Sequence, residues 1–210
     1  MIAIIDYGMG NTKSVFNAIK LLGEDVIITD DISKLESADA LVLPGVGSFS
    51  DGMKNLHERN LIKPLTNLVL EQKKPYLGIC LGLEFLANAS SEGGSNTAGL
   101  GWIKGEIKKI EPLDKSLKVP HMGWNDTQIT KNSVLLKDID SPIFYYLHSY
   151  FFDVHPEETD CITSTCQYGD VQITSSIQKE NIFAVQFHPE KSQEVGLKMI
   201  KNFIDEYVKA

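Results

Sequence analysis

Residues 75–86 have the sequence PYLGICLGLEFL, and this stretch does most to decide the fold. It places Cys80 between Gly78 and Gly82, where a short apolar strand passes directly into a helix. Both glycines suit a tight turn in which a β-carbon would collide with the neighbouring chain. The pattern predicts a nucleophile elbow with cysteine in place of serine; the alternative is a cysteine packed in the core as a small apolar residue. Its position at a helix N-terminus is expected to lower the pKa of the Cys80 thiol.

The predicted secondary structure differs between the residues before the elbow and those after it. Upstream, strands are predicted at 2–5, 26–29, 40–43 and 76–80, and helices at 11–22 and 61–73. Downstream, alternating strand-like runs occupy 102–110, 128–130, 143–152, 160–167, 171–177 and 182–187, before a final amphipathic helix that carries Leu197, Ile200, Ile204 and Tyr207. We therefore expect an α/β fold: a mixed, largely parallel central sheet flanked by helices, with an additional antiparallel sheet, in a single domain of residues 1–210.

Composition excludes several classes of protein. The chain has 210 residues, is 42% hydrophobic and carries a formal net charge of −8 without a basic run, so nucleic-acid binding is not expected. No apolar run approaches the roughly 18 residues of a membrane span, and the N-terminus lacks the basic start of a secretory signal. Three cysteines without a C-x-x-C pair fit neither a disulfide framework nor a zinc ribbon. A cytoplasmic location is the expectation.

A second group of candidate catalytic residues lies at the end of the apolar run 182–187. His188 follows this run, and Glu190 follows His188 after one proline. Strand ends of α/β sheets gather at one edge, so His188 is expected to meet Cys80 as a base, with Glu190 orienting the imidazole. A solvated histidine is the alternative, and a metal site would need further ligands at spacings that are missing. The remaining histidines are expected in surface or polar-core positions: His57, His121, His148 and His155.

The glycine-rich segment 44–49, PGVGSF, comes directly after a buried strand. An amide N–H near Val46 or Gly47, paired with that of Leu81, would form the two-donor oxyanion hole that acyl transfer requires. The alternative is an ordinary strand-to-helix turn. The segment 7–11, YGMGN, lacks the third glycine of a dinucleotide fingerprint and is interpreted as a tight turn at the same sheet edge.

With these residues identified, the chain resembles class I, triad-type glutamine amidotransferases through 75–86 and through 186–192, QFHPEKS. The segments 5–11, 44–49 and 120–125, PHMGWN, extend the resemblance to the glutaminase subunit of imidazole glycerol phosphate synthase, over essentially the whole chain. The resemblance implies a flavodoxin-like fold and a Cys80–His188–Glu190 triad. It also implies an enzyme that needs no cofactor or metal and hydrolyses L-glutamine to glutamate and ammonia.

The resemblance further implies a heterodimer with a (β/α)8-barrel cyclase subunit. That partner would use the ammonia to form imidazole glycerol phosphate and an aminoimidazole carboxamide ribotide in histidine biosynthesis. Ser149 and Tyr150 would bind glutamine through main-chain groups. The residues expected at the partner interface are Asn11, Met122, Trp124, Tyr145 and Lys191.

Glu84 departs from the usual pattern, in which a glutamine follows C-x-G-x. A carboxylate only accepts hydrogen bonds whereas an amide also donates, so the contacts of this substrate-binding position are expected to change. The difference leaves open the alternative that the chain is a paralogous glutaminase, which supplies ammonia to another synthase such as a surface-polysaccharide sugar amidotransferase. A non-catalytic binding subunit of the same fold is a further alternative, although all three triad residue types are present.

Overall fold

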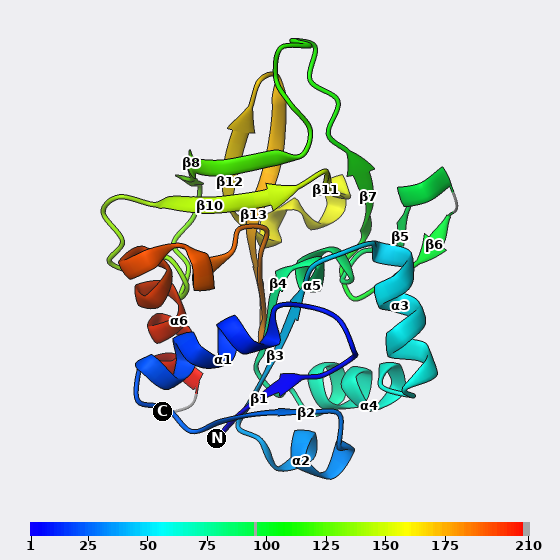
Figure 1. Cartoon of the computed structure of the whole chain (residues 1–210), viewed down its shortest axis with the longest axis vertical. Coiled ribbons are helices and arrows are strands. Elements are labelled where there is room, and N and C mark those ends of the chain that lie inside the picture. Colours follow the sequence, from blue (N-terminus) through cyan, green and yellow to red (C-terminus); the bar gives the residue numbers. More distant parts are fainter. Residues whose placement is uncertain (95, 208–210) are drawn as a thin grey trace.

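An eight-stranded mixed sheet runs through the middle of the molecule, seen in the computed structural model of residues 1–94 and 96–207 (Figure 1). Its strand order is β2-β1-β3-β4-β14-β13-β12-β9. The first five strands are parallel: β2 (Val26–Thr29), β1 (Ile2–Ile5), β3 (Ala40–Gly45), β4 (Tyr76–Cys80) and β14 (Ile182–Val185). The last three are antiparallel: β13 (Val171–Lys179), β12 (Ile162–Tyr168) and β9 (Gln128–Ile129).

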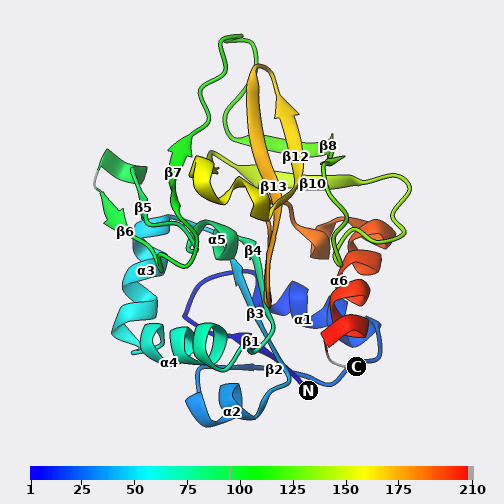
Figure 2. The ribbon, with the colours of Figure 1, turned by 180° about the vertical axis from the view of Figure 1, so that it is seen from behind.

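Helices cover both faces of the parallel part of this sheet, as the two opposite views show (Figures 1 and 2). Strand β1 explains why: Ile2 and Ile4 belong to one buried cluster, and Ala3 and Ile5 to the other. Alternate side chains of a strand point to opposite faces, so a strand that is apolar throughout needs a cover on each. One face carries α1 (Thr12–Leu21) and α6 (Gln193–Tyr207); the other carries α2 (Ile32–Ser37), α3 (Phe49–Glu58), α4 (Ile62–Thr66) and its π-helical continuation Asn67–Glu71.

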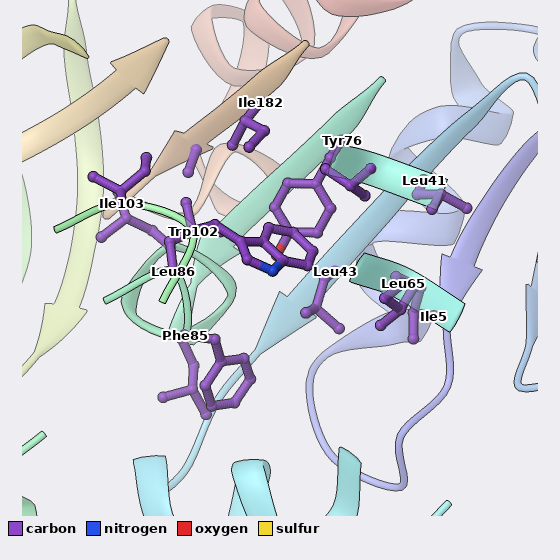
Figure 3. Close-up of a cluster of buried hydrophobic side chains, with 14 of the residues drawn as sticks. Ile5, Leu41, Leu43, Leu65, Tyr76, Phe85, Leu86, Trp102, Ile103 and Ile182 are labelled. Carbon is purple, nitrogen blue, oxygen red and sulfur yellow. The ribbon is translucent and has the colours of Figure 1, made fainter. Parts of the chain in front are cut away.

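The cluster on the α3–α4 face is drawn in Figure 3. Tyr76 of β4 packs edge-on against Trp102, with ring centroids 5.3 Å apart. The Tyr76 hydroxyl donates to the backbone oxygen of Gly82, 2.9 Å away, just beyond the elbow. Core packing therefore supports the turn that carries Cys80, which links the stability of this cluster to the geometry of the site.

Two small sheets lie beside the carboxyl ends of the central strands. One pairs β8 (His121–Asp126) with β10 (Ile143–His148) in antiparallel register. The other has the order β11-β7-β5-β6, formed by Tyr150–Val154, Gly105–Lys109, Ala89–Ser90 and Thr97–Ala98. In the described part of the chain, no helix is long and apolar enough to cross a membrane.

The predicted fold class is confirmed, whereas several predicted boundaries are wrong. The run 143–152 is two strands in different sheets, because the chain leaves one ladder at Ser149 and enters another. The run 102–110 forms a strand only from Gly105, since Trp102 and Ile103 turn into the core. Strand β8 and helix α2 were not predicted, and 182–187 ends as a strand at Val185. Of the antiparallel strands, β13, β12 and β9 extend the central sheet, whereas β8, β10, β11, β7 and β6 lie in the two small sheets.

Candidate active site

Cys80 stands on a strained turn between β4 and the short helix α5 (Leu81–Glu84). Its φ is 54°, in the left-handed region that side-chain-bearing residues rarely adopt. A β-carbon at Gly78 would lie 2.5 Å from the Gly82 oxygen, and one at Gly82 would lie 1.9 Å from the Leu43 oxygen. Both approaches are too close for any residue other than glycine, so the predicted elbow is confirmed.

A cavity of about 250 Å³ opens beside the elbow. It gathers all the residues that the sequence suggested for oxyanion and substrate binding, together with the cysteine: Val46, Gly47, Cys80, Leu81, Glu84, Ser149 and Tyr150. Four further lining residues were not predicted: Glu92, Pro120, Leu147 and His148. This volume suits a small, polar molecule of amino-acid size.

His188 and Glu190 form a buried pair at the same sheet edge. Val185 of β14 pairs with Ile79 of β4, so Gln186 comes level with Cys80 and His188 follows two residues beyond it. The Nδ1 atom of His188 lies 2.9 Å from Oε1 of Glu190, and both side chains are 1% exposed. A carboxylate accepts only, so this bond places a proton on Nδ1, and in the neutral imidazole Nε2 then carries the lone pair. Within residues 1–94 and 96–207, Nε2 has no hydrogen-bond partner.

The Cys80 sulfur has other partners in this conformation. Its S–H donates to the backbone oxygen of Leu147, 3.8 Å away, and the Gln186 Nε2 atom donates to Sγ at 3.7 Å. Across the described segments, no hydrogen bond joins Sγ to His188. A proton transfer from Cys80 to His188 would therefore require the thiol to turn from Leu147 toward the Nε2 atom.

The expected lowering of the thiol pKa is wrong for this state. Burial raises the pKa of Cys80 well above its ordinary value, and the carboxylates of Glu84 and Glu190 raise it further. The Leu81 N–H and the Gln186 amide counteract this only in part. Helix α5 has four residues, too few for a large macrodipole, so desolvation prevails and Cys80 rests as a neutral thiol.

The glycine-rich segment that follows β3 lies against the elbow. A β-carbon at Gly45 would come within 2.5 Å of the Leu81 Cβ atom, so the two backbones are in close contact. Gly47 has a φ of 115°, and a β-carbon there would lie 2.7 Å from the Met9 methyl group. No acceptor within the described residues takes the amide hydrogens of Val46 or Gly47, which leaves both as candidate donors at the cavity.

Four of the five residues expected at a partner interface lie together on one surface. On β8, Met122 is 65% exposed and Trp124 is 48% exposed. Tyr145 pairs with Trp124 across the β8–β10 ladder, and the Lys191 Nζ atom lies 5.8 Å from the centroid of the Tyr145 ring. Asn11 is placed differently: its Nδ2 atom donates to Oε1 of Glu190 at 3.4 Å, which brings it to the triad acid.

Two buried polar connections were missed by the sequence analysis. Gln186 is fully buried and its Nε2 atom donates to Glu84 Oε1 at 3.0 Å as well as to Cys80. His148, expected only in a surface or polar-core position, lines the cavity, and its Nε2 atom lies 3.0 Å from the Nδ1 atom of His121. Burial lowers the pKa of His148 to about 3 and that of His121 to about 4, so both imidazoles are neutral. The spacing of these residues gives no sign of the contacts, because each one joins segments that are distant in sequence.

The sequence of the chain matches a known protein family and several known proteins over nearly its whole length. Residues 3–207 match the family described as glutamine amidotransferase class-I. The chain belongs to this family. Its relatives include imidazole glycerol phosphate synthase subunit HisH 1 of Campylobacter jejuni strain RM1221, 47% identical over 205 residues, which cover 97% of this chain and 99% of the relative. Subunit HisH 2 of Methanococcus maripaludis is 46% identical, with coverage of 97% and 98%.

Solved structures of other glutamine amidotransferases share the fold of this family member. One described as a glutamine amidotransferase superimposes with a TM-score of 0.74 at 17% identity, covering 98% of each chain. The structure of PurLQS from Thermotoga maritima gives 0.71 at 18% identity, covering 98% of this chain and 97% of that one. Since its relatives of about 45% identity are HisH subunits, this glutamine amidotransferase fits the histidine-pathway assignment better than the sugar-amidotransferase alternative.

Proposed function

We propose that this glutamine amidotransferase, residues 1–210 taken as one unit, is the glutaminase subunit of a two-subunit imidazole glycerol phosphate synthase. Cys80 hydrolyses L-glutamine, and the ammonia passes to a (β/α)8-barrel cyclase that completes the histidine-pathway reaction. The observation that carries the proposal is the cavity beside Cys80, with the buried His188–Glu190 pair at the same sheet edge. The three cysteines are free thiols, which supports a reducing, cytoplasmic setting.

Acylation begins with the neutral thiol. His188 Nε2 takes the Cys80 proton as the sulfur attacks the side-chain carboxamide carbon of glutamine. Glu190 keeps the imidazole oriented and stabilises the imidazolium that forms. The amides of Val46, Gly47 and Leu81 hold the negative charge on the former carbonyl oxygen. The imidazolium then gives its proton to the leaving nitrogen, which departs as ammonia and leaves a glutamyl thioester on Cys80.

Deacylation reverses the proton path. His188 Nε2 removes a proton from water, which attacks the thioester carbon. The tetrahedral adduct collapses with return of the proton to sulfur, and glutamate leaves. A resting thiol of raised pKa fits this cycle, because the proton is on sulfur at its beginning and its end.

The rest of the cavity has the polarity that free glutamine needs. Glu92 and Glu84 place carboxyl groups in its wall, and Ser149 and Tyr150 present main-chain groups where β10 gives way to β11. In this proposal Glu92 receives the α-ammonium group of glutamine, and the main chain at Ser149 and Tyr150 binds its α-carboxylate end.

The experiment that tests the function measures glutamine hydrolysis with and without a cyclase subunit and its phosphoribosyl substrate. One oxyanion donor is worth about 10²–10³ in rate, so completion of the hole at Val46 and Gly47 by the partner is expected to stimulate hydrolysis by about 10²-fold or more. Imidazole glycerol phosphate should form in step with glutamate. Glutamate release without any nitrogen transfer to this acceptor would refute the assignment.

Replacing Trp124 by alanine is expected to weaken cyclase binding by about 2 kcal/mol, or roughly 30-fold in Kd. Trp124 is half-exposed beside Met122 and in ring contact with Tyr145, 6.1 Å between centroids, as an aromatic anchor at an interface would be. Titration calorimetry measures the change. Leu21→Ala, at a residue 74% exposed on α1, is the matched control and should bind normally. Equal affinities for both variants would contradict the predicted interface.

A further inference from the structure

Glu84 is a buried carboxyl group that shares one donor with the nucleophile. The side chain is 5% exposed, and Gln186 Nε2 lies 3.0 Å from its Oε1 atom and 3.7 Å from Cys80 Sγ. Gln186 itself is held at the edge of β14, directly beyond the Val185–Ile79 pair. An amide that bridges a carboxyl group and a thiol makes each sensitive to the charge of the other.

The surroundings of Glu84 disfavour its ionisation. The titratable groups that face it are the Cys80 thiol from β4, the Tyr7 phenol from the turn after β1, and the Glu92 carboxylate across the cavity. All three are negative when ionised, and among the described residues no lysine, arginine or histidine forms an ion pair with Glu84. Burial above all raises the pKa of Glu84 to about 8; Gln186 lowers it and Glu92 raises it.

We propose that Glu84 is a positioning residue that acts on Cys80 through Gln186: a neutral Glu84 permits the thiolate to form, and an ionised Glu84 suppresses it. The inference rests on the proposed role of Cys80 as nucleophile. When Glu84 loses its proton, its charge strengthens the bond from Gln186 Nε2 to Oε1 and draws the amide group away from sulfur. The same charge opposes the developing thiolate directly.

This role gives the Glu84 position a pH dependence that the usual glutamine cannot have. A glutamine there would remain neutral at every pH and leave the Gln186 donor available to sulfur. The predicted consequence is a nucleophile that is inhibited on the alkaline side, where an isolated thiol would become more reactive. The device belongs to this chain's own sequence, because it depends on a carboxyl group at position 84.

The test compares the protein with its Glu84→Gln variant by the rate of Cys80 alkylation with iodoacetamide, followed by peptide mass spectrometry from about pH 6 to 9.5. The two rates should coincide near neutral pH, and the variant should react about tenfold faster at the alkaline end, since a nearby like charge moves a thiol pKa by about one unit or more. Glu106→Gln, on the exposed face of β7, is the control and should follow the unmodified protein.

A ratio of alkylation rates that stays constant across the pH range would overturn the inference, because a purely structural effect of Glu84→Gln has no reason to follow its titration. The pH profile of glutamine turnover with the cyclase gives a second readout: relative to its own rate at neutral pH, the unmodified protein should lose activity at alkaline pH, and the variant should show no such loss. Failure of both proteins to hydrolyse glutamine, with the alkylation profiles still divergent, would refute the proposed function and leave the coupling standing. Glutamine hydrolysis by both proteins, with coincident alkylation profiles, would refute the coupling and leave the proposed function standing.

Discussion

Cys80→Ala is expected to abolish glutamine hydrolysis, with a loss of at least about 10⁴-fold, while the protein folds and binds its cyclase normally. In the proposed mechanism the sulfur is the attacking atom, and neither Cys161 nor Cys166, both buried away from the cavity, can replace it. The substitution also leaves the close packing of the elbow in place, because Gly78 and Gly82 are unchanged. Coupled measurement of glutamate release checks the activity.

Cys161→Ala provides the matched control for this variant, because it removes another buried thiol without touching the cavity. It should keep full glutaminase activity. Calorimetric unfolding and cyclase titration confirm that the Cys80→Ala protein is intact. Near-full hydrolysis by that intact protein would remove the basis for the proposed triad.

Gly82→Ala is expected to prevent folding, or to lower the free energy of unfolding by about 4 kcal/mol or more. The added methyl group would lie 1.9 Å from the backbone oxygen of Leu43, and a strand backbone in the middle of a sheet cannot retreat. Denaturant unfolding of the purified protein measures the loss. Where no folded protein accumulates, the fraction recovered in soluble form gives the same comparison.

Gly23→Ala is the control that separates steric collision from backbone strain. Gly23 has a φ of 83° and nothing within 4 Å of an added β-carbon, so its substitution should cost only about 1 kcal/mol. A Gly82→Ala protein as stable as the Gly23→Ala protein would show that the elbow is less tightly packed than the structure indicates.

The parallel half of the fold could be predicted because its signals are local. Each strand there is a short apolar run bounded by a turn, and the G-x-C-x-G pattern identifies the elbow without knowledge of the rest of the chain. Placing His188 at the same sheet edge as Cys80 needed only the rule that parallel strands end at one edge, and β4 and β14 obey it.

The antiparallel half could not be predicted as well, because its pairings are decided at long range. The run 143–152 has one continuous apolar texture, yet Tyr145 pairs with Trp124 in one sheet and Phe152 pairs with Ile107 in another. Strand β8 alternates buried His121 with exposed Met122 and Trp124, a pattern that resembles a polar loop until the partner strand is known.

The electrostatics of the site depended on burial, which motif spacing does not report. The elbow pattern suggested a thiol activated by a helix end, but the completed fold encloses Cys80 with two carboxyl groups and raises its pKa instead. Gln186 belongs to the motif 186–192, but its hydrogen bond to Glu84 depends on the position of β14 beside the elbow, which the motif does not predict.

The covalent state of Cys80 during turnover tests the central claim most directly. Rapid acid quenching of the glutaminase–cyclase complex with glutamine, followed by peptide mass spectrometry, would trap any acyl-enzyme. We predict a glutamyl adduct confined to the peptide that contains Cys80, formed and lost at least as fast as glutamate is released. Steady glutamate release with every Cys80 peptide unmodified, or with the adduct on Cys161 or Cys166, would contradict cleavage of the amide by this residue.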